Sequence, residues 1–371
     1  MRIIYVADFF LPSNKAYSIH VFQMLDAFGK LGLNSQLLIP YFDKSKIKKS
    51  LRFYGLFNKK KIRIDRIFKK EKNFNFLTRI IFGLNIALTL NKSNSNSLVI
   101  TRSLSSSVFL SLFKIHHFLE IHQEIQGLSK FLLVNLNFIN SNYIIKNIFI
   151  SKSLARFYKN RTKKFIVLHD GVNLNRFKFK KKIKKVKKIS YVGSFYKGRG
   201  VELIIEMAKK LKKFKFYLYG RRDEKFLNLP KNIFIKSFVN QSKVPSVLTN
   251  SDLLLLPYER RVMISTSSSS PDNSKFMSPL KLFESLASGT PIICSEIAVL
   301  KEVLKHNYNS ILVKKFENKF EWVKEITKLS YNTNKLKKLS VNGVKTAKKY
   351  TWENRAKIFI KEYKKKNLFF N

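Results

Sequence analysis

The sequence predicts an α/β protein with two doubly wound domains whose sheets are largely parallel. Short apolar runs alternate with amphipathic helical runs along the whole chain, a pattern typical of βαβ units. A lysine-rich run, FKFKKKIKKVKK, has no apolar period and separates two alternating halves, as a solvated linker does. The 371 residues are enough for two cores of ordinary domain size.

The composition bounds the class of protein. With 45% hydrophobic and 26% charged residues, the chain is globular rather than intrinsically disordered. Its single cysteine, Cys294, excludes an intramolecular disulfide framework and a metal site made of several cysteines. Because Cys294 lies in the apolar run IIC, we expect a buried thiol and a reducing compartment.

The formal net charge of +50 is extreme. Such a charge attracts nucleic acid, acidic lipid or anionic substrates. Lysine exceeds the acidic residues along nearly the whole chain rather than in one stripe, so a general compositional bias is an equally good explanation. The main functional alternative to that bias is attraction to an anionic membrane surface.

We expect neither a leader peptide nor a transmembrane segment. The first residues, MRIIYVADFF, indicate a strand rather than a cationic leader with a cleavage site. The most apolar helical candidates, Phe76–Leu90 and Phe131–Ile139, are too short or too interrupted by polar residues to cross a bilayer.

Strands and helices alternate in the first half of the chain. The expected strands are Arg2–Ala7, Ser35–Tyr41, Lys61–Ile67, Leu98–Arg102, Phe118–His122 and Asn147–Ser151. The expected helices are Ser18–Gly32, Phe74–Leu90, Ser103–Lys114 and Ser153–Tyr158, and a polar, lysine-rich connector follows Tyr41.

Reactive side chains of this half follow its strands. Phe118–His122 delivers Glu120 and His122 to the carboxyl end of a strand, where ligands of open α/β sheets collect. Arg102 ends another strand and could bind an anionic acceptor or pair with Glu120; the sequence leaves both open. Ser18 could cap the first helix on the acceptor side, and we expect His20 to be structural.

The second half alternates in the same way. The expected strands are Lys188–Phe195, Phe214–Gly220, Asn232–Val239, Ser251–Tyr258, Pro291–Ser295 and Ser310–Val313. The expected helices are Val201–Leu211, Lys243–Leu248, one that begins at Ser278, Ala298–Leu304, Phe320–Leu329, Lys335–Tyr350 and Trp352–Lys365. The serine-rich segment TSSSSPDNS predicts a loop that orders around a ligand.

A strand, a loop with glycines and cations, and a helix open this second half. Gly193 and Ser194 follow the strand, and Lys197 and Arg199 lie in the loop. This layout suits a phosphate. Because a guanidinium offers phosphate a bidentate fork, we favour Arg199 over Lys197.

A second candidate phosphate site lies in MSPLKLFESLASGTPIICSEIAVLKEVL, which begins at Met277. Ser278-Pro279-Leu280 predicts the start of a helix with the serine as N-cap. Lys281 and Glu284 share one side of that helix. Its N-terminus suits a phosphate, and the Glu284 carboxylate could accept hydrogen bonds from a ribose. An isolated K-x-x-E is more often a solvated ion pair, so the flanking residues decide.

Those flanking residues resemble the donor-binding segment of retaining glycosyltransferases of family 4. The segments YVGSFYKGRGVELIIE and SDLLLLPY resemble the same family, and the resemblance covers Lys188–Lys365 well and the first half loosely. It implies the GT-B fold, in which two Rossmann-like domains face each other across a cleft. We therefore expect an acceptor-side domain at 1–175, a basic linker at 176–187, a nucleotide-sugar domain at 188–350, and a C-terminal helix at 351–371 that crosses back to the first domain.

The resemblance also implies roles for the candidate residues. Glu284 would bind the ribose of a nucleotide-sugar, and Arg199, with Lys197, would neutralise the leaving diphosphate. The backbone at Gly220 would approach the base. The text E-I-H-Q-E resembles the family position at which a histidine, here His122, lies beside the donor sugar and the acceptor.

Two positions depart from the family pattern. Phe276 stands where many members have the first Glu of a Glu-x7-Glu pair, which implies altered donor choice or lost activity. Ser194 stands where the family usually has an arginine.

The resemblance implies transfer of a sugar, with retention, from a nucleotide-sugar to a cell-envelope saccharide or lipid-linked acceptor. We expect a cytoplasmic enzyme, attached peripherally to the inner face of the cytoplasmic membrane, without metal or cofactor. The alternatives are a catalytically inactive GT-B binding partner, a GT-B nucleotide-sugar epimerase and a basic nucleic-acid binder. The epimerase is disfavoured by the text that begins at Ser278, and the nucleic-acid binder because no module with aromatics on one basic face is found.

Overall fold

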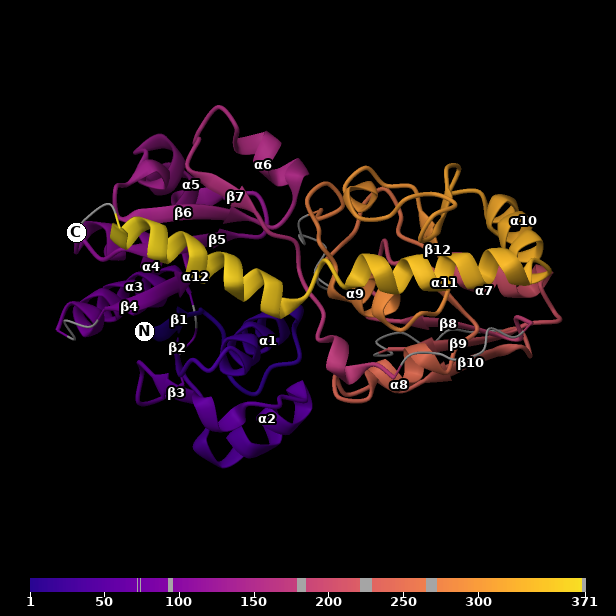
Figure 1. Ribbon diagram of the computed structural model, residues 1–371, viewed down its shortest axis with the longest axis horizontal. Helices are drawn as coiled ribbons and strands as arrows, with labels where there is room; N and C mark the ends of the chain where they lie inside the picture. Colours follow the sequence, from indigo (N-terminus) through magenta and orange to yellow (C-terminus); the bar gives the residue numbers. More distant parts are fainter. Residues whose placement is uncertain are drawn as a thin grey trace. The chain divides into compact units, whose positions relative to one another are not determined.

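The computed structural model describes residues 1–71, 73, 75–92, 96–178, 185–220, 229–264 and 272–368 (Figure 1). The chain divides into two compact units. Unit 1 contains Met1–His169 and Trp352–Asn371, and unit 2 contains Asp170–Thr351. Unit 2 therefore starts before the linker expected at 176–187. Residues 179–184 of that linker and residues 266–271 of the serine-rich segment lie outside the described part.

Unit 1 is built on a parallel sheet of seven strands in the order β3-β2-β1-β4-β5-β6-β7. Its strands are β1 (Arg2–Val6), β2 (Ser35–Ile39), β3 (Ile62–Arg66), β4 (Ser97–Thr101), β5 (His117–Ile121), β6 (Ile144–Phe149) and β7 (Phe165–Val167). Its α-helices are α1 (Ala16–Lys30), α2 (Ile47–Tyr54), α3 (Phe76–Asn91), α4 (Leu104–Leu112), α5 (Gly127–Lys130), α6 (Lys152–Tyr158) and α12 (Trp352–Leu368). The central strands are buried, which explains why their sequences are largely apolar, although β5 also carries Glu120.

Unit 2 is built on a parallel sheet of six strands in the order β10-β9-β8-β11-β12-β13. Its strands are β8 (Lys188–Val192), β9 (Lys215–Tyr219), β10 (Ile233–Lys236), β11 (Leu253–Leu256), β12 (Ile292–Ser295) and β13 (Ile311–Val313). Its α-helices are α7 (Val201–Lys210), α8 (Val244–Thr249), α9 (Leu280–Ala287), α10 (Lys319–Ser330) and α11 (Thr333–Ala347). The predicted pair of doubly wound parallel sheets is therefore confirmed.

Each sheet has one point at which the strand order reverses. β1 lies between β2 and β4, and β8 lies between β9 and β11. At such a point, the chain leaves two adjacent strands toward opposite faces of the sheet. The loops that follow these strands therefore diverge at their carboxyl ends and leave room for a ligand. The two places to search for a site are therefore the carboxyl ends of β1 and β4, and those of β8 and β11.

The last helix, α12, belongs to unit 1 and packs against α1. Trp352, Ala356 and Phe359 are buried at helical spacing, and the ring centroid of Phe359 lies 5.1 Å from that of Phe118 on β5. Glu353 forms an ion pair with Lys30 on α1. The C-terminal segment is thus held by an apolar stripe as well as by charge.

Two local predictions are wrong. The lysine-rich connector after Tyr41 contains α2, which forms because Tyr54 is fully buried and stacks on Phe22 with ring centroids 4.2 Å apart. The segment expected as a helix at Ala298–Leu304 forms only a 3-10 turn at Leu300–Glu302. It ends there because the Asn309 side chain accepts from the backbone N–H of Lys305 and donates to the carbonyl of Val303.

The most apolar helical candidates do not continue into long helices. One forms α3, and the other splits into a π-helical turn at Phe131–Asn135 and a 3-10 turn at Phe138–Asn140. Within the described ranges, no helix has both the length and the apolar character needed to cross a membrane.

Phe359→Ala should destabilise unit 1 by about 3–5 kcal/mol, because it removes a fully buried ring from the contact between α12 and the sheet. The neighbouring Ile358, which is 36% exposed, is the matched control, and Ile358→Ala should cost less than about 1 kcal/mol. Urea unfolding followed by circular dichroism measures both. Equal losses in the two variants would contradict the packing described for α12.

Candidate active site

The loop between β8 and α7 crosses the carboxyl end of β11. Gly198 has a φ of +83°, and a Cβ there would lie 1.8 Å from the carbonyl oxygen of Arg261. Gly200 has a φ of +71°, and a Cβ there would lie 1.9 Å from the carbonyl oxygen of Pro257. Only glycine combines this conformation with so close an approach. The two glycines therefore fix Arg199, which lies between them, at the point where the strand order of unit 2 reverses.

Two cations, Arg199 and Lys281, meet at this point. Lys281 Nζ donates a hydrogen bond to the Tyr191 hydroxyl at 3.1 Å. The ring centroid of Tyr258 lies 4.8 Å from Lys281 Nζ and 5.5 Å from Arg199 Cζ. Arg199 also donates to the carbonyl of Met263 at 3.1 Å. Among the described residues, no carboxylate pairs with either cation, so the aromatic faces and neutral oxygens are their only partners.

The electrostatics of this pair favour an anionic ligand. Burial, and then the charge of Arg199, hold the pKa of Lys281 well below its ordinary value. A bound anion would favour the charged form of the lysine. Lys197, in contrast, is exposed. The structure thus brings together Arg199 and Lys281, whereas the sequence suggested Lys197 as the companion of Arg199.

Helix α9 begins beside these cations, one residue later than expected. Pro279 occupies the N-cap position and Leu280 is the first helical residue, so Ser278 is not the N-cap. The Ser278 hydroxyl instead accepts a hydrogen bond from the backbone N–H of Asp170 at 3.1 Å. This contact fixes the chain that enters unit 2 against the start of α9.

Glu284 lies one turn into α9 and is buried. Gln241 donates a hydrogen bond to Glu284 Oε1, and Arg176 donates to the backbone carbonyl of Gln241. Burial raises the pKa of Glu284 to about 7, although the charge of Arg176 opposes the shift. Within the described part of the chain, no hydrogen bond reaches Oε2, so this oxygen is available to a ligand hydroxyl. Sequence patterns did not indicate Gln241 or Arg176, which lie on other segments.

The remaining donor-side candidates line the ends of β8 and β9. A Cβ at Gly220 would lie 2.2 Å from the carbonyl oxygen of Gly193, so these two backbones touch. Ser194 accepts a hydrogen bond at its carbonyl from the Tyr191 hydroxyl at 2.7 Å. Residues 221–228, which follow Gly220, lie outside the described part.

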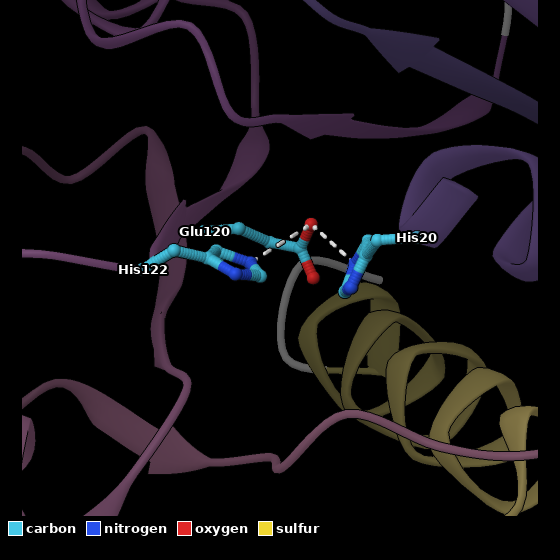
Figure 2. Close-up of side chains that lie close together, drawn as sticks. All are labelled: His20, Glu120 and His122. Carbon is cyan, nitrogen blue, oxygen red and sulfur yellow. Dashed lines mark ion pairs between the residues drawn. The ribbon is translucent and has the colours of Figure 1, made fainter. Parts of the chain in front are cut away.

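In unit 1, the candidate His122 lies beside a buried carboxylate. Figure 2 shows the rings of His20 and His122 directed at Glu120. His20 Nε2 lies 3.3 Å and His122 Nε2 lies 3.9 Å from Glu120 Oε2. Tyr5 donates a hydrogen bond to the same oxygen, and Arg355 on α12 forms an ion pair with Oε1. Arg355, and not Arg102, is therefore the ion-pair partner of Glu120.

These neighbours set the protonation of the cluster. Burial opposes ionisation of Glu120, but the charges of His20 and Arg355 hold its pKa well below the ordinary value. Burial, followed by the charge of Arg102, lowers the pKa of His122 to about 3. At neutral pH, His122 is therefore a neutral imidazole beside an ionised carboxylate, which orients the ring as a hydrogen-bond donor or acceptor for a ligand.

One atom each from His20, Glu120 and His122 could in principle hold a metal ion, since these ligand atoms lie within 4.8 Å of one another. Both oxygens of Glu120 are already hydrogen-bonded, by Tyr5 and Arg355. A divalent cation would displace those donors and lie beside a guanidinium, so the residues present fit an ion-pair network better than a metal centre.

The two acceptor-side candidates differ in their surroundings. Ser18 lies inside the first turn of α1, fully buried, and its hydroxyl donates to the carbonyl of Lys15 at 2.9 Å. It does not cap the helix as expected. Arg102 is half-buried at the carboxyl end of β4, and its Cζ lies 3.8 Å from the ring centroid of Tyr17.

Comparison with known families agrees with this geometry. Residues 174–346 match the family described as Glycosyl transferases group 1. The match covers most of unit 2, including the loop that carries Arg199 and the helix that carries Glu284, and it confirms the enzyme class predicted from the sequence. No curated protein sequence matches the chain.

Solved structures resemble the whole chain. A glycosyltransferase from Rickettsia africae is 14% identical with a TM-score of 0.74, and the alignment covers 98% of both chains. HepE from Anabaena, in complex with UDP and glucose, is 12% identical with a TM-score of 0.68, over 96% of this chain and 98% of that one. WaaG, a glycosyltransferase involved in lipopolysaccharide biosynthesis, is 13% identical with a TM-score of 0.62, over 96% and 99%. These likenesses confirm the GT-B fold.

The raised pKa of Glu284 predicts a pH dependence of stability. The folded state binds a proton up to about pH 7, whereas the unfolded carboxyl releases it near pH 4.5. The free energy of unfolding should therefore fall, relative to that of Glu284→Gln, by about 3 kcal/mol as the pH rises through this window. Urea unfolding of both proteins between pH 4 and 8 measures the difference. Parallel curves would contradict the buried, protonatable state of Glu284.

Proposed function

We propose that the protein transfers a sugar, with retention of anomeric configuration, from a nucleotide-sugar donor to a cell-envelope saccharide or lipid-linked acceptor. The observation that carries the proposal is the pair of cations Arg199 and Lys281, for which the described part of the chain supplies no carboxylate partner, in a region that matches a glycosyltransferase family. Retention is proposed from the resemblance of the sequence to family 4.

The cation pair suits the diphosphate of the donor. As the bond between the sugar and the diphosphate breaks, negative charge grows on the leaving group. Cations that are already in place stabilise that charge without reorganisation. Arg199 offers a fork of N–H groups and Lys281 a point charge, and the N-terminus of α9 adds a partial positive charge nearby.

Glu284 suits the ribose of the donor. Its Oε2 can accept a hydrogen bond from a ribose hydroxyl, while Gln241 holds Oε1 in place. A hydrogen bond to the ionised carboxylate would also oppose the effect of burial on its pKa. The touching backbones of Gly193 and Gly220 support a role for the Gly220 turn beside the base, where a side chain would not fit.

His122 suits the sugar and the acceptor. Its neutral imidazole can exchange hydrogen bonds with a sugar hydroxyl, and the ionised Glu120 fixes the ring. We propose that His122 positions the reacting sugar rather than acting as a cationic acid, because its pKa near 3 keeps it uncharged at neutral pH.

The nature of the substrates is inferred from similar proteins and from charge. HepE was solved with UDP and glucose, and WaaG acts in lipopolysaccharide biosynthesis, which supports a nucleoside diphosphate donor and an envelope acceptor. The net charge of +50 supports peripheral attachment to the anionic inner face of the cytoplasmic membrane. Phe276 and Ser194 favour one second candidate function, a GT-B protein that binds a nucleotide without transferring a sugar.

One nucleotide among UDP, GDP and ADP, or one of their sugars, should stabilise the protein selectively in a thermal-shift screen. A ligand at one hundred times its Kd adds about 2.7 kcal/mol to the free energy of unfolding. Arg199→Ala, Lys281→Ala and Glu284→Ala should each reduce the shift, because each removes a group that contacts the diphosphate or the ribose.

Arg260→Ala is the matched control, since it removes an equal charge from an exposed ion pair with Glu317 in the same unit. It should leave the shift unchanged. If no nucleotide stabilises the folded wild type, donor binding is refuted. If a nucleotide stabilises it but its sugar is neither transferred nor hydrolysed, the second candidate function replaces the first.

Sugar transfer should not require a divalent cation. Arg199 and Lys281 already supply positive charge at the diphosphate, which is the task that a metal ion performs in other sites. Excess EDTA should therefore change the initial rate less than about twofold, and added Mg²⁺ or Mn²⁺ should not restore the activity of Lys281→Ala. A rate abolished by EDTA and restored by one metal would contradict this assignment.

A further inference from the structure

Unit 1 has a cation that the proposed function does not use. Arg102 follows β4, and its backbone N–H donates to the carbonyl of Val6 at the end of β1. It therefore lies at the point where the strand order of unit 1 reverses, the place at which a ligand of this sheet is expected.

The guanidinium of Arg102 is held by an aromatic face. Its Cζ lies 3.8 Å from the ring centroid of Tyr17. The Tyr17 hydroxyl donates to Asp8 Oδ1 at 2.8 Å and accepts from the backbone N–H of Asp8 at 3.2 Å, so the ring is anchored at the end of β1. Stacking occupies one face of the guanidinium and leaves its N–H donors, which point outward in its plane, to bind a ligand.

The nearby carboxylates are engaged elsewhere. Asp8 Oδ2 accepts a hydrogen bond from Arg79 Nη1 at 3.1 Å, and Asp8 Oδ1 accepts one from the Tyr17 hydroxyl. Glu120 is paired with Arg355. Among the residues that the structure describes, none forms an ion pair with Arg102, and the side chain is only half-buried. The Asp8 carboxylate also attracts Arg102 electrostatically, so the charge of Arg102 is partly offset. A charge that the fold anchors and only partly offsets favours an anionic ligand.

This cation lies close to the candidate catalytic histidine. After burial, the charge of Arg102 is the largest influence that lowers the pKa of His122. β4 also pairs in parallel with β5 at Thr101 and Leu119, so Arg102 follows β4 beside the segment that carries Glu120 and His122. A ligand bound by Arg102 would thus lie at the same edge of the sheet as His122. The diphosphate of the donor already has its own cations in unit 2, Arg199 and Lys281, so the anion at Arg102 is assigned to the second substrate.

We propose that the acceptor carries an anionic group, a phosphate or a carboxylate, and that Arg102, stacked on Tyr17, binds it. This inference rests on the proposed function, because only a protein that transfers a sugar has an acceptor. The anion site itself can be tested without any transfer reaction.

The first experiment maps arginine reactivity in the full-length wild type. Phenylglyoxal modification is followed by peptide mass spectrometry in the presence of methyl phosphate, glucuronate or neutral methyl glucoside. Modification of Arg102 should slow by about fivefold or more with at least one of the two anions and not with the neutral sugar. Arg66 is the internal control, since it lies 5.4 Å from the ring of Tyr41 and already donates to the carbonyl of Phe42. Equal protection of Arg66 and Arg102, or none at Arg102, overturns the proposal.

The second experiment measures transfer from the donor found by thermal shift to octyl glucosides that bear at C6 a hydroxyl, a carboxylate or a phosphate. One anionic acceptor should exceed the neutral one in kcat/KM by about tenfold or more, and which one does so identifies the anion. Arg102→Gln should abolish that preference through KM, Arg102→Lys should keep part of it, and Arg66→Gln should keep all of it.

The outcomes separate this inference from the proposed function. The nucleotide thermal shift of Arg102→Gln should equal that of the wild type, which also shows that the variant is folded. An equal loss of kcat/KM by Arg102→Gln with neutral and anionic acceptors would show that Arg102 has only a structural role, and would overturn the proposal. Protection of Arg102 in a protein that no nucleotide stabilises would refute the proposed function and leave the anion site standing.

Discussion

The ionised carboxylate of Glu120, buried in unit 1, is the interaction on which the arrangement of that unit depends. An isolated buried charge costs several kcal/mol, so Glu120 is compatible with the core only while its partners remain. Those partners come from separate elements: Tyr5 from β1, His20 from α1 and Arg355 from α12. Arg355 also donates to the carbonyl of His169 after β7. The same contacts that hold the C-terminal helix therefore also orient His122.

In unit 2, by contrast, the positive charges at the candidate site are not paired with a described carboxylate. Lys281 is partly buried and packs against Tyr191 and Tyr258 with Arg199 nearby, and no described carboxylate offsets the two positive charges. A fold gains nothing from such an arrangement, since burial and repulsion both disfavour the charged lysine. The arrangement becomes favourable when an anion binds. In unit 1 the buried charge is paired, as expected of a structural network. In unit 2 the positive charges lack an opposite charge among the described residues, as expected of a binding site.

Much of the fold could be predicted because its signals are local. Apolar runs predicted every strand except β7 to within a few residues. The glycines around Arg199 predicted the turn that brings this residue to the end of β8. The two failures have different causes: a side-chain hydrogen bond a few residues away in one, and a packing contact distant in sequence in the other. Ala298–Leu304 has a helical pattern, yet the Asn309 side chain binds its last groups and ends it after one turn. The lysine-rich connector contains a helix because Tyr54 packs on Phe22.

The sequence by itself determined the two alternating halves, the loop that presents Arg199 and the helix that presents Glu284, because helix and strand periodicity and turn chemistry act over a few residues. Only the tertiary structure decided which charges meet. Arg355 reaches Glu120 across 235 positions of the chain, and Lys281 reaches Tyr191 across 90. Strand position had offered Arg102 as one possible partner of Glu120, and sequence proximity had suggested Lys197 as the companion of Arg199. Strand order and the packing of α12 set such contacts, and no short-range pattern encodes them.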